Sequence, residues 1–170
     1  MTAARMARLR RRTKVLLILA AVLLAVSGLL AYGYFRYVAV QRYTVENGRL
    51  TVAAQPVNGL GTVLVTNKGY ALYMFPPDAA KRVTCTGDCA RGWPPLILPD
   101  RASVVAGPGI RTDLLGTGLA PNGKRVVTYR SWPLYTYLGD ADPGHAAGQG
   151  KNDDGGDWYA IHPSGQIVGR

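Results

Sequence analysis

Residue types that often carry chemistry are scarce in this chain. Only two cysteines and two histidines occur among its 170 residues. The haem-attachment pattern Cys-x-x-Cys-His is absent, and two thiols without a nearby histidine make a poor zinc site. The sequence also shows no Gly-rich phosphate loop after a strand, no paired-Glu motif and no Ser-His-Asp order. We therefore expect no enzyme, no cofactor and no metal centre, and we nominate no catalytic residue.

Charged side chains are absent from one long stretch. Residues 15–35 hold none over 21 positions, and a helix of that length spans a hydrocarbon core of about 30 Å. Six cations precede the stretch, in a basic tail at residues 1–14. This arrangement predicts a cytoplasmic tail, a single-pass signal-anchor helix in the plasma membrane, and a C-terminal domain outside.

The alternative for the same stretch is a secretory signal peptide. Ala25-Val26-Ser27 is a passable cleavage site, which would remove residues 1–27. The apolar run continues past that site and exceeds the roughly 7–15 residues usual for a signal-peptide core. The anchor is therefore the favoured interpretation.

The formal net charge of +10 is unevenly distributed. Six of the 20 basic residues lie in the tail, so the remaining 14 basic and 10 acidic residues leave only +4 for the rest of the chain. No basic patch with interleaved aromatic residues remains. We expect no nucleic-acid partner. The expected partners are the lipid bilayer, through residues 15–35, and a protein of the cell envelope.

An internal repeat organises the chain after the apolar stretch. Residues 65–78 and 127–140 align without a gap, with five identities in 14 positions. Each copy has β-branched residues, a short turn and then aromatic residues, which is typical of a β-hairpin. Each copy needs a partner for its apolar face. The expected fold is therefore mainly β, with two pseudo-repeated hairpin units packed as a small sandwich or partly open barrel.

The expected organisation follows from these boundaries. The repeat copies cover about residues 62–98 and 124–163 of an extracytoplasmic domain at 60–170. Before them, residues 36–59 alternate apolar and polar side chains around Asn47-Gly48, a strong signal for a tight hairpin turn. This segment is expected to form a β-ribbon or an extended stalk.

The second strand of each copy ends in the same short motif. Its residues are Tyr73, Phe75 and Asp78 in the first copy, and Tyr135, Tyr137 and Asp140 in the second. The two aromatic residues of each motif share one face of an extended chain and are expected in the core. The aspartate lies where the strand must stop and can accept backbone N–H bonds. The alternative is that the two carboxylates form a paired polar site related by pseudo-symmetry.

The motif, Tyr-x-(Phe/Trp/Tyr)-x-x-Asp, resembles the signature of a bacterial family of secreted repeats and predicted lipoproteins of unknown function. Residues 85–95 are similar to the family's Cys-x-Gly-x-Cys-Ala-x-x-Trp-Pro-Pro segment, and the resemblance covers about residues 60–163. It implies an extracytoplasmic, repeated protein and supplies no catalytic residues. One departure concerns the lipid attachment site, because the first cysteine here is Cys85 rather than one just after the signal sequence.

Two further features leave alternatives open. Cys85 and Cys89 are expected to form a disulfide, the default for an even cysteine count outside the cytoplasm, and a redox-active pair is the alternative. The loop 140–157 carries five aspartates against one lysine, so Ca²⁺ ligation is an alternative to turn formation.

The sequence favours a membrane-anchored binding or structural module of the envelope. The alternative is a redox or metal-handling protein that uses the cysteine pair or the acidic loop.

Overall fold

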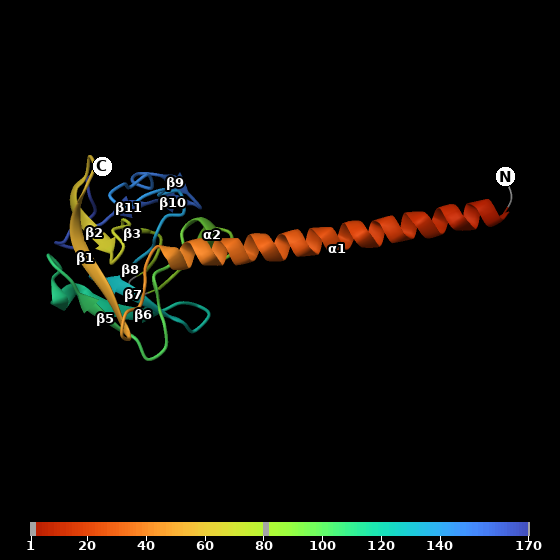
Figure 1. The fold of residues 1–170 in the computed structure, drawn as a ribbon. Helices are drawn as coiled ribbons and strands as arrows, with labels where there is room; N and C mark the ends of the chain where they lie inside the picture. The colour runs from red at the N-terminus through yellow and green to blue at the C-terminus, as the bar shows by residue number, and fades with distance from the viewer. Residues whose placement is uncertain (1–2, 80–81, 170) are drawn as a thin grey trace. The chain divides into compact units, whose positions relative to one another are not determined.

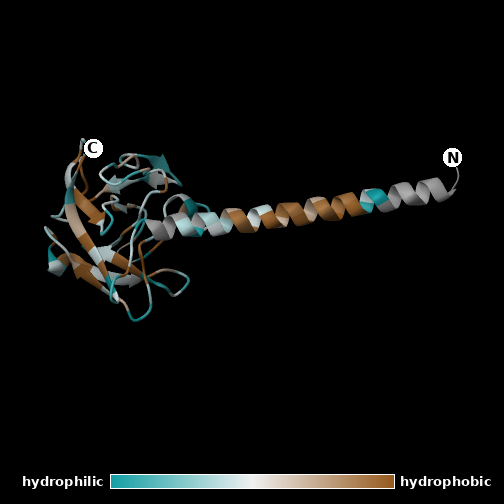
Figure 2. Cartoon of the chain, in the orientation of Figure 1, coloured by the Kyte–Doolittle hydropathy of each residue, from teal (hydrophilic) through white to brown (hydrophobic). Residues whose placement is uncertain are grey.

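The computed structural model describes residues 3–79 and 82–169. The chain divides into two compact units, Met1–Tyr37 and Val38–Arg170. Helix α1 (Ala3–Gln41) has 39 residues, and its Arg12–Tyr34 segment has a mean hydropathy of 2.7 and no buried part. Apolar residues form the long brown band of α1 in Figure 2. By length and composition, this helix can be a membrane anchor or a signal sequence.

The second unit consists of short strands in several small sheets (Figure 1). One sheet has the order β2-β1-β5, made of β1 (Arg49–Val57), β2 (Gly61–Thr66) and β5 (Ser103–Ala106). Another has the order β4-β7-β6, made of β4 (Ile97–Leu98), β6 (Leu115–Leu119) and β7 (Arg125–Tyr129), and β8 (Trp132–Pro133) also pairs with β7.

Two further sheets have two strands each. They pair β3 (Tyr73–Met74) with β11 (Tyr159–Ala160), and β9 (Asn152–Asp153) with β10 (Gly156–Asp157). The remaining elements are the short helices α2 (Cys89–Gly92) and η1 (Thr112–Leu114). The fold is thus mainly β, as expected, and in the described part of the chain no sheet closes into a barrel.

Strand β2 contains three consecutive apolar residues, Val63–Val65, because both of its faces are buried. Val63 and Val65 enter one cluster of buried side chains, which also contains the motif aromatics. Leu64, between them, enters a second cluster with Leu50 and Leu72. Successive side chains of a strand point to opposite faces. Both faces of β2 are therefore covered by core.

The segment before the repeats belongs to the domain. Asn47 and Gly48 form a tight turn with φ values of 49° and 72°, and Glu46 and Arg49 exchange backbone hydrogen bonds across it. The strand after the turn, β1, lies between β2 and β5 in one sheet. Residues 49–57 are therefore a central strand of the repeat domain instead of part of a separate ribbon or stalk.

The hairpin turns of the two copies differ in length. In the first copy Val65 pairs with Ala71, and the Thr66 N–H donates to the Tyr70 carbonyl. In the second, Tyr129 pairs with Trp132, which leaves two turn residues that both have positive φ. The second turn is thus one residue shorter. The ungapped alignment therefore matches the structure only after the turns. Before the turns, Val65 corresponds to Thr128 in the structure, one residue beyond Val127, its partner in the alignment.

Candidate functional site

The two motif segments meet at their first tyrosines, which form an isolated antiparallel bridge. The Tyr73 N–H donates to the Tyr135 carbonyl at 2.9 Å, and the Tyr135 N–H donates to the Tyr73 carbonyl at 2.9 Å. Because the exchange is reciprocal, the two copies are related here by a local pseudo-two-fold axis.

The motif side chains cross this axis. The Tyr73 hydroxyl donates to Asp140 Oδ2 at 2.9 Å, and the Tyr135 hydroxyl donates to Asp78 Oδ2 at 2.5 Å. All four side chains are buried. The aspartate of each motif therefore accepts a hydrogen bond from the tyrosine of the other motif.

The second oxygen of each aspartate closes the loop that follows it. Asp78 Oδ1 accepts the Thr84 backbone N–H at 2.7 Å and the Thr84 hydroxyl at 2.6 Å. Asp140 Oδ1 accepts the Ala147 backbone N–H at 2.8 Å. Each carboxylate thus accepts hydrogen bonds from the loop that follows it and from the tyrosine of the other copy. A backbone N–H group is among the donors in both cases.

Burial sets the protonation of this network. Burial is the main reason that the pKa of Tyr73 lies far above its ordinary value, and the nearby Asp140 carboxylate raises this pKa further. Burial and then the hydrogen bond to Asp78 do the same to the pKa of Tyr135. Burial also raises the pKa of Asp140, and the hydrogen bond from Tyr73 opposes that shift. Both tyrosines are therefore neutral hydrogen-bond donors.

Four aromatic rings form a stacked column that also crosses the axis. Phe75 stacks on Trp158 with ring centroids 4.2 Å apart, and Tyr137 stacks on Trp93 at 4.1 Å. The two tryptophans stack on each other at 4.0 Å and 2°. Each motif's second aromatic residue thus packs on the tryptophan of the other copy. Phe75, Trp93 and Trp158 are buried in the core, whereas Tyr137 is only partly buried and packs against it.

The chain after each tryptophan continues the exchange. In the first copy, β4 pairs with β7 of the second, and the Leu96 carbonyl accepts the Val127 N–H at 2.9 Å. In the second copy, β11 pairs with β3 of the first, and the Ile161 carbonyl accepts the Leu64 N–H at 2.8 Å. Neither copy has a complete core without the other.

A buried arginine was not anticipated from the sequence. Arg42, which is 4% exposed, donates from Nε to the Tyr137 carbonyl at 2.9 Å. Its Nη2 donates to the carbonyls of Leu138 and Asp140, both at 2.6 Å. The guanidinium thus holds the end of the second motif. An arginine that follows an apolar helix usually reflects the orientation of that helix in the membrane. The position of Arg42 in the sequence therefore gives no sign that its side chain is buried in the domain.

Cys85 and Cys89 form a disulfide with a Cα–Cα distance of 5.3 Å, which confirms the expected pairing. Cys85 lies in the core at 2% exposed. The disulfide borders two surface hollows of about 470 and 490 Å³.

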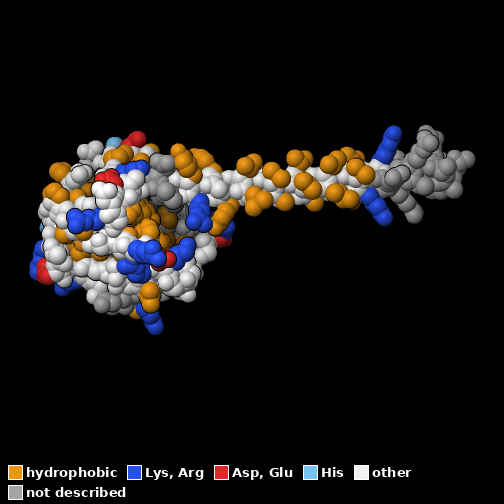
Figure 3. All heavy atoms as spheres, turned by 60° about the horizontal axis from the view of Figure 1, so that its bottom comes forward, with side chains coloured by type: hydrophobic (Ala, Val, Ile, Leu, Met, Phe, Trp, Pro, Cys, Tyr) orange, Lys and Arg blue, Asp and Glu red, His pale blue; other side chains and the backbone are white. Residues whose placement is uncertain are grey.

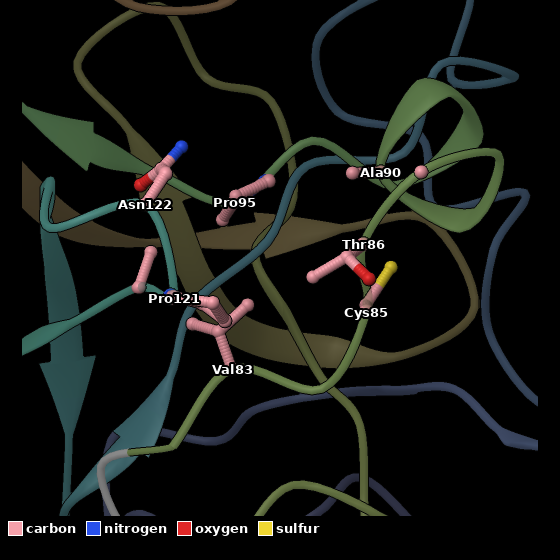
Figure 4. A pocket seen from close by; sticks show the side chains of 9 residues that line it. Val83, Cys85, Thr86, Ala90, Pro95, Pro121 and Asn122 are labelled. Atoms are coloured by element: carbon pink, nitrogen blue, oxygen red, sulfur yellow. The ribbon is translucent and has the colours of Figure 1, made fainter.

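The first hollow lies between the disulfide loop and the turn from β6 to β7. In Figure 4, Thr86 and Ala90 lie on one side of it, and Val83 and Pro121 on the other. Among the residues that the structure describes, no charged side chain lines it. Asp88 and Asp154 contribute to the second hollow, where Asp88 pairs with Arg91.

The acidic loop 140–157 does not gather its aspartates. Asp140 is buried at the repeat axis, and Asp157 accepts hydrogen bonds from the Asn152 amide at 2.7 Å and the Tyr159 hydroxyl at 2.9 Å. Among residues 3–79 and 82–169, no group of three or more His, Cys, Asp or Glu side chains is placed to hold a metal ion.

These features define a two-repeat β domain that follows a hydrophobic N-terminal helix. A family model described as a secreted repeat of unknown function matches residues 57–97 and 116–162. The chain belongs to this family. No curated protein and no solved structure matches the chain.

Proposed function

We propose that this chain is a membrane-anchored, extracytoplasmic binding or structural module of the cell envelope, without a catalytic role. The observation that carries the proposal is the apolar Arg12–Tyr34 segment of α1, followed by a domain of a secreted-repeat family. Apolar side chains dominate the middle of α1 in the space-filling view (Figure 3). Such a surface is favourable in a lipid core and unfavourable in water.

The position of the candidate cleavage site supports an anchor over a signal peptide. Ser27 lies inside α1, which continues to Gln41, and its hydroxyl donates to the Leu24 carbonyl at 2.9 Å. A processing protease needs an extended chain at the cut, so the helix opposes cleavage there. The chain then remains attached to its membrane segment.

The motif residues support a structural use of the repeat. The carboxylate oxygens of Asp78 and Asp140 both have hydrogen-bond donors within the domain. In the described part of the chain, no buried side-chain nitrogen or oxygen lacks a partner. A reacting group needs access to substrate, whereas these groups are enclosed and satisfied. Binding to a partner is then a property of the domain surface.

Proteolysis of intact cells tests this function. A C-terminal epitope tag on the full chain should be removed by added protease and retained in the membrane fraction without it. A tag that survives until the cells are lysed would place the domain on the cytoplasmic side. A tag released into the medium without protease would favour secretion after signal cleavage.

A redox role for Cys85 and Cys89 is the second candidate function. One observation favours it, namely that the disulfide borders both hollows. The burial of Cys85 opposes it, because attack at Cys89 would release a thiolate into the core, where desolvation disfavours charge. Thiol titration in glutathione buffers separates the two roles, since a structural bond stays oxidised in the range where a redox pair cycles.

A further inference from the structure

The surface that joins the two copies is here called the repeat interface. Its residues are Tyr73, Phe75, Asp78 and Trp93 from the first copy, and Tyr135, Tyr137, Asp140 and Trp158 from the second. Each contact has a counterpart across the pseudo-two-fold axis. An interface of this kind is self-complementary, as in isologous dimers, where the same patch is used by both partners.

We propose that the repeat interface also takes a second copy of this chain, in an exchanged dimer. The first copy of one chain pairs there with the second copy of the other, and the reverse pairing completes the dimer. Every hydrogen bond and ring stack of the repeat interface is then formed again. Each copy supplies only half of the repeat interface, so the other half can come from the same chain, as in this structure, or from a second chain.

The connection between the copies offers one place for the exchange. β5 stays with the first copy through its parallel pairing with β1, and β6 stays with the second through β7. Only residues 107–114 link them. Within this link, the Gly107 N–H donates to the Val52 carbonyl and the Pro108 carbonyl accepts the Ala54 N–H. A rearranged link gives up these two hydrogen bonds and the close packing of Gly107 and Gly109 on β1.

Complementary lesions test this dimer in the full-length chain. A Tyr73→Phe chain and an Asp140→Asn chain, carrying different affinity tags, are co-expressed and solubilised in detergent. In an exchanged dimer of these two, one repeat interface holds both lesions, on the same hydrogen bond, and the other holds none. We expect sequential affinity purification to recover this mixed dimer.

The matched control places both lesions in the first copy. A Tyr73→Phe chain is co-expressed with an Asp78→Asn chain, so each repeat interface of the mixed dimer holds one lesion. We expect about tenfold less mixed dimer than from the complementary pair, the ratio that corresponds to about 1.4 kcal/mol. Equal recovery from the two pairs would show association through another surface, including α1, and would overturn the proposal.

A second measurement needs no variant. Parent chains with two different tags are either refolded together from denaturant or folded separately and then mixed. Exchange requires the repeat interface to open, so mixed dimers should form on joint refolding and not on mixing. Monomers alone under both conditions, or mixed dimers after simple mixing, would contradict an exchanged dimer.

Discussion

Double-mutant cycles across the repeat interface test the crossed pairing of the motifs. The Tyr73 hydroxyl and Asp140 Oδ2 are 2.9 Å apart and buried, and a hydrogen bond to a charged group contributes about 1.5–3 kcal/mol. We expect Tyr73→Phe and Asp140→Asn to show a coupling energy of that size in the free energy of unfolding. The equivalent cycle, Tyr135→Phe with Asp78→Asn, should give a similar value.

The control cycle combines residues of the same motif. Tyr73 and Asp78 are five positions apart in the sequence but donate to and accept from different partners. Their changes should add to within about 0.5 kcal/mol, as for sites without shared contacts. Urea unfolding of the four single and three double variants measures all three couplings. A larger coupling within a motif than between motifs would refute the crossed arrangement.

The remaining predictions concern three other features. Replacing Cys85 and Cys89 by Ser should cost about 2 kcal/mol, because the closed loop is short, and thermal unfolding should show a midpoint several degrees lower. Arg42→Ala should cost roughly 3 kcal/mol, because three hydrogen bonds to carbonyls are lost, one of them fully buried, and Arg42→Lys should be intermediate in denaturant titrations. Burial raises the folded-state pKa of Asp140, so this group's favourable contribution is largest at acid pH and is lost as pH rises through that pKa. Asp140→Asn should remove this part of the pH dependence of the unfolding free energy, and an unchanged profile would contradict it.

The hairpins were predictable because their signals are local. β-branched residues before a turn and aromatic residues after it set β2 and β7, and the short strands β3 and β8 that follow the turns. The pairing of β5 with β1 over Ser103–Ala106 has no such local signal, because it is a non-local contact set by packing.

The crossing of the motifs was not predictable from spacing. Alternation along a strand shows that Tyr73 and Phe75 share a face, but not which copy that face meets. The chemistry of Asp78 and Asp140 indicated acceptors for backbone N–H groups, whereas the tyrosine donors come from 57 and 67 residues away. An asparagine at either position has a single acceptor oxygen and cannot serve donors at both carboxylate oxygens, so we expect Asn to weaken the network.

The intact mass of the chain purified from the membrane fraction tests the proposed function most directly. We expect the full-length chain, 18.2 kDa from its sequence, with Cys85 and Cys89 protected from alkylation until a reductant is added. That result requires both an uncleaved α1 and an oxidising compartment for the domain. A mass for a chain that begins near residue 28 would show cleavage of a signal peptide, and two thiols that alkylate without reductant would place the domain in the cytoplasm.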